Sequence, residues 1–114
     1  SPLLSSPPSP VFHGSAEENI DAICANGLDP TKRGINGQAH GKGEYFGIDA
    51  GISQPYCRGG RKMVVFVVLL DPSGVTVECE QRRMVVINRP EFQLPLAVLT
   101  FEPQPPPQHH APPA

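Results

Sequence analysis

Apolar and polar positions divide the chain into a central region and two flanking arms. Residues 1–10 and 102–114 are rich in proline, serine and glutamine and have too few apolar positions to build a core. Residues 11–101 carry apolar runs separated by turn-forming residues, over a length that suits one domain. We therefore expect disordered arms at 1–10 and 102–114 around one folded domain at 11–101.

One helix is expected near the start of this domain, from Ser15 to Gly27. Ser15 and Glu18 have the spacing of a capping box, in which each side chain satisfies a backbone N–H of the first turn. Ile20, Ile23 and Cys24 recur at helical spacing and predict one buried face. Gly27 suits the left-handed position after the last turn, with Leu28 folding back onto the helix.

The rest of the pattern is typical of strands. Met63–Leu70 is a continuous apolar, β-branched run, which predicts a central strand buried on both faces. One helix followed mostly by strands indicates an α+β fold. The other expected elements are a loop at Asp29–Gly43, strands at Glu44–Gly47, Val75–Cys79, Met84–Ile87 and Ala97–Phe101, a helical turn at Asp49–Gln54 with Asp49 as its cap, and a proline turn at Asp71–Gly74.

Composition narrows the class of protein. A net charge of −2 and a pI near 6.0 disfavour binding to nucleic acid through its phosphates. Two basic clusters, Arg58/Arg61/Lys62 and Arg82/Arg83, are either solvated loop charges or contacts for an anionic ligand. Three widely spaced cysteines predict neither a disulfide framework nor a zinc site. The sequence has no signal-peptide pattern and no apolar run long enough for a bilayer, so we expect an intracellular protein of the cytoplasm or nucleus without a membrane partner. We also expect the protein to be a monomer.

Common catalytic motifs are absent from the sequence. The stretch GQAHGKGEYFG is not a Walker loop, because Asn36 stands at the first glycine position and Gly43 replaces the magnesium-binding Ser or Thr. No G-x-S-x-G nucleophile elbow is present, although a Ser-His-Asp triad is not excluded by composition. His13, His40, His109 and His110 lack metal-ligand spacing, so we expect no metal site.

A set of polar and aromatic residues remains. His13-Gly14 precedes the expected helix, Tyr45-Phe46 follows a Gly-Lys-Gly turn, and Ser53 and Tyr56 follow in the next segment. Two tyrosine rings can sandwich a flat ligand, and a glycine backbone and a serine hydroxyl can bind an amide. Each residue also has a purely structural interpretation, in which His13 is a satisfied core histidine, Tyr45 a strand aromatic and Ser53 a capping hydroxyl.

Together these motifs resemble the catalytic domain of poly(ADP-ribose) polymerase-like, or diphtheria-toxin-type, ADP-ribosyltransferases. The resemblance is carried by His13-Gly14-Ser15, by Gly41-Lys42-Gly43-Glu44-Tyr45-Phe46 and by Ser53-Gln54-Pro55-Tyr56-Cys57. The intervals from Tyr45 to Ser53 and to Tyr56, eight and eleven residues, match the family, and the strands at Met63–Leu70 and Leu94–Phe101 resemble its central and closing strands.

The resemblance implies a split β-sheet fold that binds NAD as its substrate. By position, His13 would hold the 2′-hydroxyl of the nicotinamide ribose, and Gly14 and Ser53 would bind the carboxamide. Tyr45 and Tyr56 would flank the nicotinamide ring. The resemblance further implies that Ser15 and Asn19 contact the adenosine side and that residues 29–40 take the place of the donor loop.

The sequence departs from the family at two positions. After the His and the Tyr, polymerases have a glutamate as the third signature residue. Alignment through the last strand places Met84 at this position. If the register of the alignment shifts, Arg83 or Glu80 takes the position instead. Glu44 stands where the family usually has an apolar residue. It faces either the cleft or solvent, and we expect the solvent-facing orientation.

Two functional hypotheses follow from the resemblance. The first is a mono-ADP-ribosyltransferase that cleaves the nicotinamide–ribose bond and transfers ADP-ribose to a protein acceptor, with His13, Tyr45 and Met84 as the catalytic signature. The second is a weak or inactive module that binds NAD or ADP-ribose, or that mediates interactions. The proline-rich arms are either linkers or ligands for SH3- or WW-type grooves.

Overall fold

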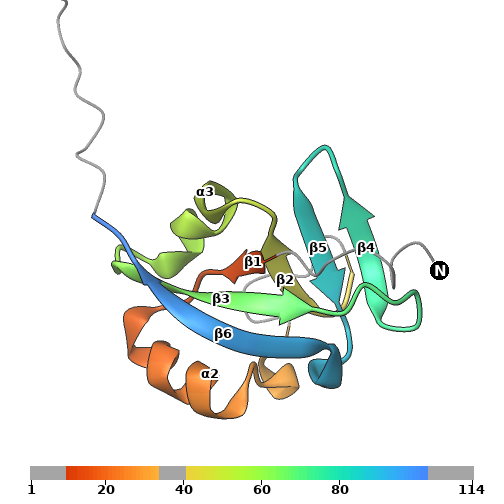
Figure 1. Ribbon diagram of the computed structural model, residues 1–114, viewed down its shortest axis with the longest axis horizontal. Coiled ribbons are helices and arrows are strands. Elements are labelled where there is room, and N and C mark those ends of the chain that lie inside the picture. The colour runs from red at the N-terminus through yellow and green to blue at the C-terminus, as the bar shows by residue number, and fades with distance from the viewer. Residues whose placement is uncertain (1–9, 34–40, 103–114) are drawn as a thin grey trace, which may run out of the picture.

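The computed structural model describes residues 10–33 and 41–102, which form a six-stranded antiparallel sheet in the order β4-β5-β2-β1-β3-β6 (Figure 1). The expected arms, apart from Pro10 and Glu102, and residues 34–40 of the expected loop lie outside the described residues. The strands are β1 (Pro10–His13), β2 (Glu44–Gly47), β3 (Lys62–Val68), β4 (Val75–Cys79), β5 (Met84–Ile87) and β6 (Gln93–Thr100). The α+β fold expected from the sequence is confirmed.

Apolar patterning located most strands correctly. β2, β4 and β5 have the predicted bounds, and β3 lies inside the sheet between β1 and β6, with Met63, Val64 and Phe66 almost fully buried. β6 begins at Gln93, four residues before the strand predicted from the apolar pattern and one before the closing strand implied by the resemblance, because its first half also pairs with β3 across a register shift at Val65/Phe66. Pro95 obscured this half in the sequence, since proline is tolerated only at sheet edges and bulges.

The N-terminal helical segment begins later than its capping box predicted. It consists of η1 (Glu17–Asn19) followed by α2 (Ile20–Asn26), and Ser15 caps neither helix. The Ser15 hydroxyl instead accepts a hydrogen bond from Asn19 Nδ2 at 3.2 Å. At the other end Gly27 has the expected positive φ of 77°, and its N–H donates to Ile23 O at 2.8 Å.

The two faces of the sheet are covered by different helices. α2 packs against β3 and β6, with Ile20 and Ile23 buried, whereas Cys24 is exposed and does not join the buried face as expected. α3 (Ala50–Ser53) packs against β1 and β2 on the other face and leads into η3 (Gln54–Cys57) (Figure 1). The core cluster on the α2 face comprises Val11, Ile20, Ile23, Phe46, Val64, Phe66, Val68, Val85 and Ile87.

Short turns connect the remaining strands. Asp71 accepts from Gly74 N at 2.9 Å through its carbonyl, and its side chain accepts from Ser73 N at 2.9 Å, which closes the predicted proline turn before β4. The segments η2 (Pro30–Lys32) and η4 (Pro90–Phe92) each begin with proline. In the part of the chain that the structure describes, none of the helices has the length and apolar character needed to cross a bilayer.

Candidate active site

His13 and Tyr45, from neighbouring strands, meet directly. His13 is the last residue of β1, and its Nδ1 lies 3.0 Å from the backbone oxygen of Tyr45 in β2. The imidazole also packs against the rings of Phe46 and Phe66, with centroid distances of 5.8 and 6.1 Å. These contacts hold the ring at the α2 face of the sheet, where the core cluster lies.

The contact with Tyr45 fixes the tautomer of His13. A carbonyl oxygen can only accept, so Nδ1 must carry the proton and donate it. Burial lowers the pKa of His13 below its usual value near 6.5, and this effect exceeds the opposing effects of the Tyr45 carbonyl and of the Glu44 carboxylate. At neutral pH His13 is therefore an uncharged imidazole whose Nε2 is a hydrogen-bond acceptor.

We expect His13 to titrate below pH 6.5. Because its folded-state pKa is depressed, the unfolded chain binds the proton more tightly, so the free energy of unfolding falls as the pH drops below about 6.5. NMR titration of the His13 ring signals, assigned by their loss in His13→Asn, measures this pKa. A midpoint at or above the ordinary value would contradict the argument from burial.

Gly14 brings the end of β1 against the α3–η3 segment. A Cβ added at Gly14 would lie 2.1 Å from the backbone oxygen of Ser53 and 3.0 Å from the Cβ of Tyr56. No side chain fits there, so glycine is required for the close approach of the two backbones. Gly14, Ser53 and Tyr56, which lie far apart in the sequence, are therefore neighbours in the fold.

Ser53 is buried, and its hydroxyl has a protein partner. It is 4% exposed, and its Oγ donates to the backbone oxygen of Phe12 at 2.7 Å. A hydroxyl has one proton and two lone pairs, so in this state Ser53 can only accept from a further group. Tyr56 has the opposite character, because 59% of its surface is exposed and its ring is accessible to a ligand.

Met84 lies on the α3 face, separated from β1 by β2. It is the first residue of β5 and pairs with Gly47, which in turn pairs with Phe12. Strand alternation places Met84 on the same face as Gly47 and Tyr45, and opposite to the ring of His13. His13 and Tyr45 are thus joined by a hydrogen bond, whereas Met84 shares a face of the sheet with Tyr45 and is separated from His13 by β2.

The two alternatives to Met84 lie in the turn before β5. Arg83 has a positive φ of 51° and forms an exposed ion pair with Asp49, with Nε 2.5 Å from Oδ2. This pair holds the pKa of Asp49 below its usual range and explains why the Asp49 side chain does not cap α3 as expected. Glu80 is exposed, and its carbonyl accepts from Arg83 N at 3.1 Å.

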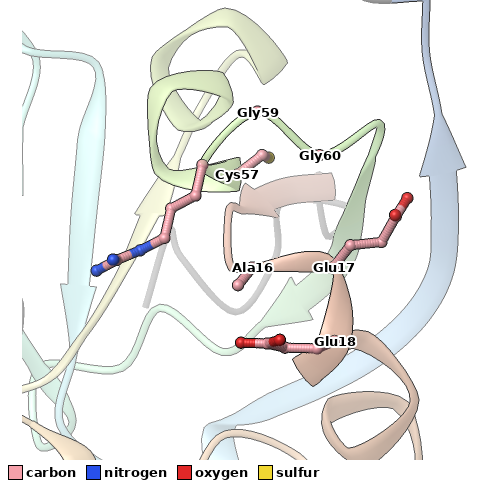
Figure 2. Close-up of a pocket in the computed structure, with 7 residues that line it drawn as sticks. Ala16, Glu17, Glu18, Cys57, Gly59 and Gly60 are labelled. Carbon is pink, nitrogen blue, oxygen red and sulfur yellow. The ribbon is translucent and has the colours of Figure 1, made fainter.

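A shallow hollow of about 750 Å³ adjoins the start of η1 (Figure 2). Ala16, Glu17 and Glu18 line one side, and the turn from Cys57 to Gly60 lines the other. Ser15 and Asn19, expected on the adenosine side, border this region in sequence. The Cys57 thiol is buried, which raises its pKa and leaves it a poor nucleophile.

Glu44 does not face solvent as expected. It is 6% exposed, its carboxylate is bound by Arg33 through both Nε and NH2, and Gln93 Nε2 donates to Oε1 at 2.6 Å. Glu44 and Phe46 are two residues apart in β2 and therefore share the α2 face. The prediction was wrong because the partners of Glu44 come from distant segments.

Sequence reasoning missed three features of this region. The first is the Arg33–Glu44–Gln93 cluster, which no local pattern signals. The second is Gly47, where an added Cβ would lie 2.7 Å from Ser53 Oγ. The third is the lining of the hollow, for which the pair Gly59-Gly60 was the one signal in the sequence.

Comparison with known proteins gives matches to one family. The sequence model described as "Poly(ADP-ribose) polymerase catalytic domain" matches residues 9–84. The human protein named "Protein mono-ADP-ribosyltransferase PARP11" is 42% identical over 48 residues, which cover 42% of this chain and 14% of the relative. Mouse "Protein mono-ADP-ribosyltransferase PARP12" is 40% identical over 48 residues, which cover 42% of this chain and 7% of that relative. The matched segment thus spans about a seventh or less of these relatives.

Proposed function

The chain belongs to the family of poly(ADP-ribose) polymerase catalytic domains, and on that basis we propose that it is an ADP-ribosyltransferase with NAD as its substrate. It cleaves the nicotinamide–ribose bond and transfers one ADP-ribose unit to a protein acceptor. The observation that carries the proposal is the hydrogen bond from His13 Nδ1 to the Tyr45 carbonyl, which joins two signature residues and leaves Nε2 as an acceptor.

His13 serves as the anchor for the nicotinamide ribose. His13 is the last residue of β1, so in this proposal its Nε2 accepts a hydrogen bond from a ribose hydroxyl at the strand end, where the ligand passes round from the face that carries the Tyr45 ring. The Nδ1–H···O contact with Tyr45 keeps the imidazole oriented. The depressed pKa supports this role, because a protonated imidazole has no acceptor to offer.

Gly14, Ser53 and the two tyrosines bind the nicotinamide. Gly14 binds the carboxamide through its backbone, and its lack of a side chain is what brings that backbone close to Ser53 and Tyr56. The exposed ring of Tyr56 stacks on one face of the ligand opposite Tyr45. Ser53 accepts from the amide nitrogen while it donates to Phe12 O; donation to the amide oxygen requires its hydroxyl to leave Phe12. Holding the ring and the ribose separately orients the bond that breaks.

Met84 favours transfer of single units over chain growth. Cleavage develops positive charge on the ribose, and a thioether neither balances this charge nor accepts a strong hydrogen bond. The relatives PARP11 and PARP12, both named as mono-ADP-ribosyltransferases, support the same choice.

We expect Met84→Glu to raise the rate of nicotinamide release from NAD by roughly tenfold, because a carboxylate stabilises the developing charge. Met84→Gln is the matched control, since it has a similar length and polarity but no charge. Release of nicotinamide is followed by chromatography. Equal rates for the Glu and Gln variants would rule out a role for charge at this position.

The direct test of the proposed function is incubation of the purified chain with NAD labelled in its adenosine part. We expect label on the chain itself or on proteins of an added lysate. The alternative function is a module that binds NAD or ADP-ribose without transfer, with which the missing charge at the third signature position is also compatible. Measurable NAD binding without any transferred label would select the binding module.

A further inference from the structure

Glu44 is a buried carboxylate at the start of β2, the strand that carries Tyr45, and it is not among the residues proposed to bind NAD. Arg33 binds both of its oxygens, and Gln93 donates to one of them. The same two side chains also bind the end of β5, because Arg33 NH2 donates to Asn88 O at 3.0 Å and Gln93 Nε2 donates to Ile87 O at 3.2 Å. One carboxylate thus connects η2, β2, β5 and β6.

The connection between η2 and β2 is tied to β2 at both of its described ends. Arg33, immediately after η2, is held by Glu44, and the carbonyl of Gly41 accepts from the Tyr45 hydroxyl at 2.7 Å. Gly43, which directly precedes β2, lies so close to β5 that an added Cβ would be 2.7 Å from Ile87 O. The chain that leads into Tyr45 is therefore fixed by neighbours on several sides.

Stability alone does not account for this ion pair. Removing two charges from water costs several kcal/mol, and a pair of apolar side chains can often replace a buried ion pair without loss of stability. Apolar side chains do not fix their relative orientation in this way, whereas a guanidinium and a carboxylate joined by two hydrogen bonds have a fixed relative orientation. The Arg33–Glu44 pair is suited to set the geometry of β2.

We propose that Glu44 is a positioning residue, which acts through Arg33 to hold Tyr45 in the arrangement that binds NAD. The Tyr45 ring contacts the nicotinamide and its carbonyl orients His13, so a displacement of β2 affects both ligand contacts at once. This inference rests on the proposed function, but it concerns a residue that does not itself touch the substrate.

The test is a comparison of Arg33→Leu, Glu44→Leu and the double variant, with Tm, kcat and KM for NAD measured for each. Arg33→Leu leaves the buried Glu44 carboxylate without its cation and lowers Tm by roughly 10–20 °C. Glu44→Leu lowers Tm less, because Arg33 is partly exposed and still donates to Asn88 O. The double variant regains most of this Tm, yet its KM for NAD is raised about tenfold while kcat changes little, the pattern of lost ground-state binding. Glu91→Gln, which removes a charge from the exposed Arg89–Glu91 pair, is the control and leaves Tm and KM unchanged.

Arg33→Lys is the second variant, in case the double variant does not fold. It keeps the charge but loses the two-point contact, so KM rises while Tm changes less than in Arg33→Leu. An unchanged KM in the folded variants, or a fall in kcat alone, would overturn the positioning role while leaving the transferase function intact. A wild-type chain that neither transfers nor binds NAD would overturn both proposals.

Discussion

Replacing His13 by asparagine lowers ADP-ribose transfer at least about 100-fold, an expectation based on the loss of one positioned hydrogen-bonding group from the site. The asparagine amide can still donate to the Tyr45 carbonyl in place of Nδ1, which preserves the contact seen at 3.0 Å. It has no acceptor at the position of Nε2, so the ribose hydroxyl loses its partner. Transfer of label from NAD measures the effect.

His13→Gln is the matched variant for this experiment. Its longer side chain brings an amide oxygen to the region of Nε2, so it keeps an acceptor and gives up the donor to Tyr45. We expect more residual transfer from the glutamine variant than from the asparagine variant. Full activity of His13→Asn, with its fold confirmed by thermal unfolding, would show that the ribose is anchored elsewhere.

Replacing Gly14 by alanine is expected to destabilise the chain by about 1–3 kcal/mol and to remove NAD binding. The new Cβ would lie 2.1 Å from the backbone oxygen of Ser53, a contact that forces β1 and the α3–η3 segment apart. Because Tyr56 and Ser53 belong to this segment, the two nicotinamide contacts move away from His13. Denaturant unfolding and NAD titration measure the two effects separately.

Gly51→Ala is the control for this change. Gly51 lies within α3, and an added Cβ there meets no atom within 4 Å. Alanine is favoured over glycine inside a helix, so this variant is expected to gain about 0.5–1 kcal/mol and to keep its NAD affinity. If both alanine variants behaved alike, the close approach of β1 and α3 would not be what makes Gly14 necessary.

Much of the fold could be predicted because the signals are local. Glu44–Gly47 and Met84–Ile87 have the predicted bounds, since short runs of β-branched and aromatic residues specify strands with little help from the rest of the chain. The Asp71–Gly74 turn also formed as expected, because proline and aspartate restrict their own backbone.

The errors arose where a distant partner competed with a local one. Ser15 does not cap the helix, because the helical segment begins one residue later, with Ala16 at the N-cap position, and the Ser15 hydroxyl accepts from Asn19 Nδ2. Asp49 likewise bonds to Arg83 instead of capping α3. At such positions the side chain does not cap the helix as its residue type predicts, because a hydrogen bond elsewhere in the fold satisfies the same polar group.

The sequence by itself determined the strands, the turns and the spacing of His13, Tyr45, Ser53 and Tyr56, because each depends on residue type and local backbone geometry. Only the tertiary structure decided the tautomer of His13, the crowding at Gly14 and the burial of Glu44. Each of these depends on a group that is remote in sequence: the Tyr45 carbonyl, the Ser53 carbonyl, and the side chains of Arg33 and Gln93. Desolvation and close packing act between neighbours in space, which a one-dimensional pattern does not identify.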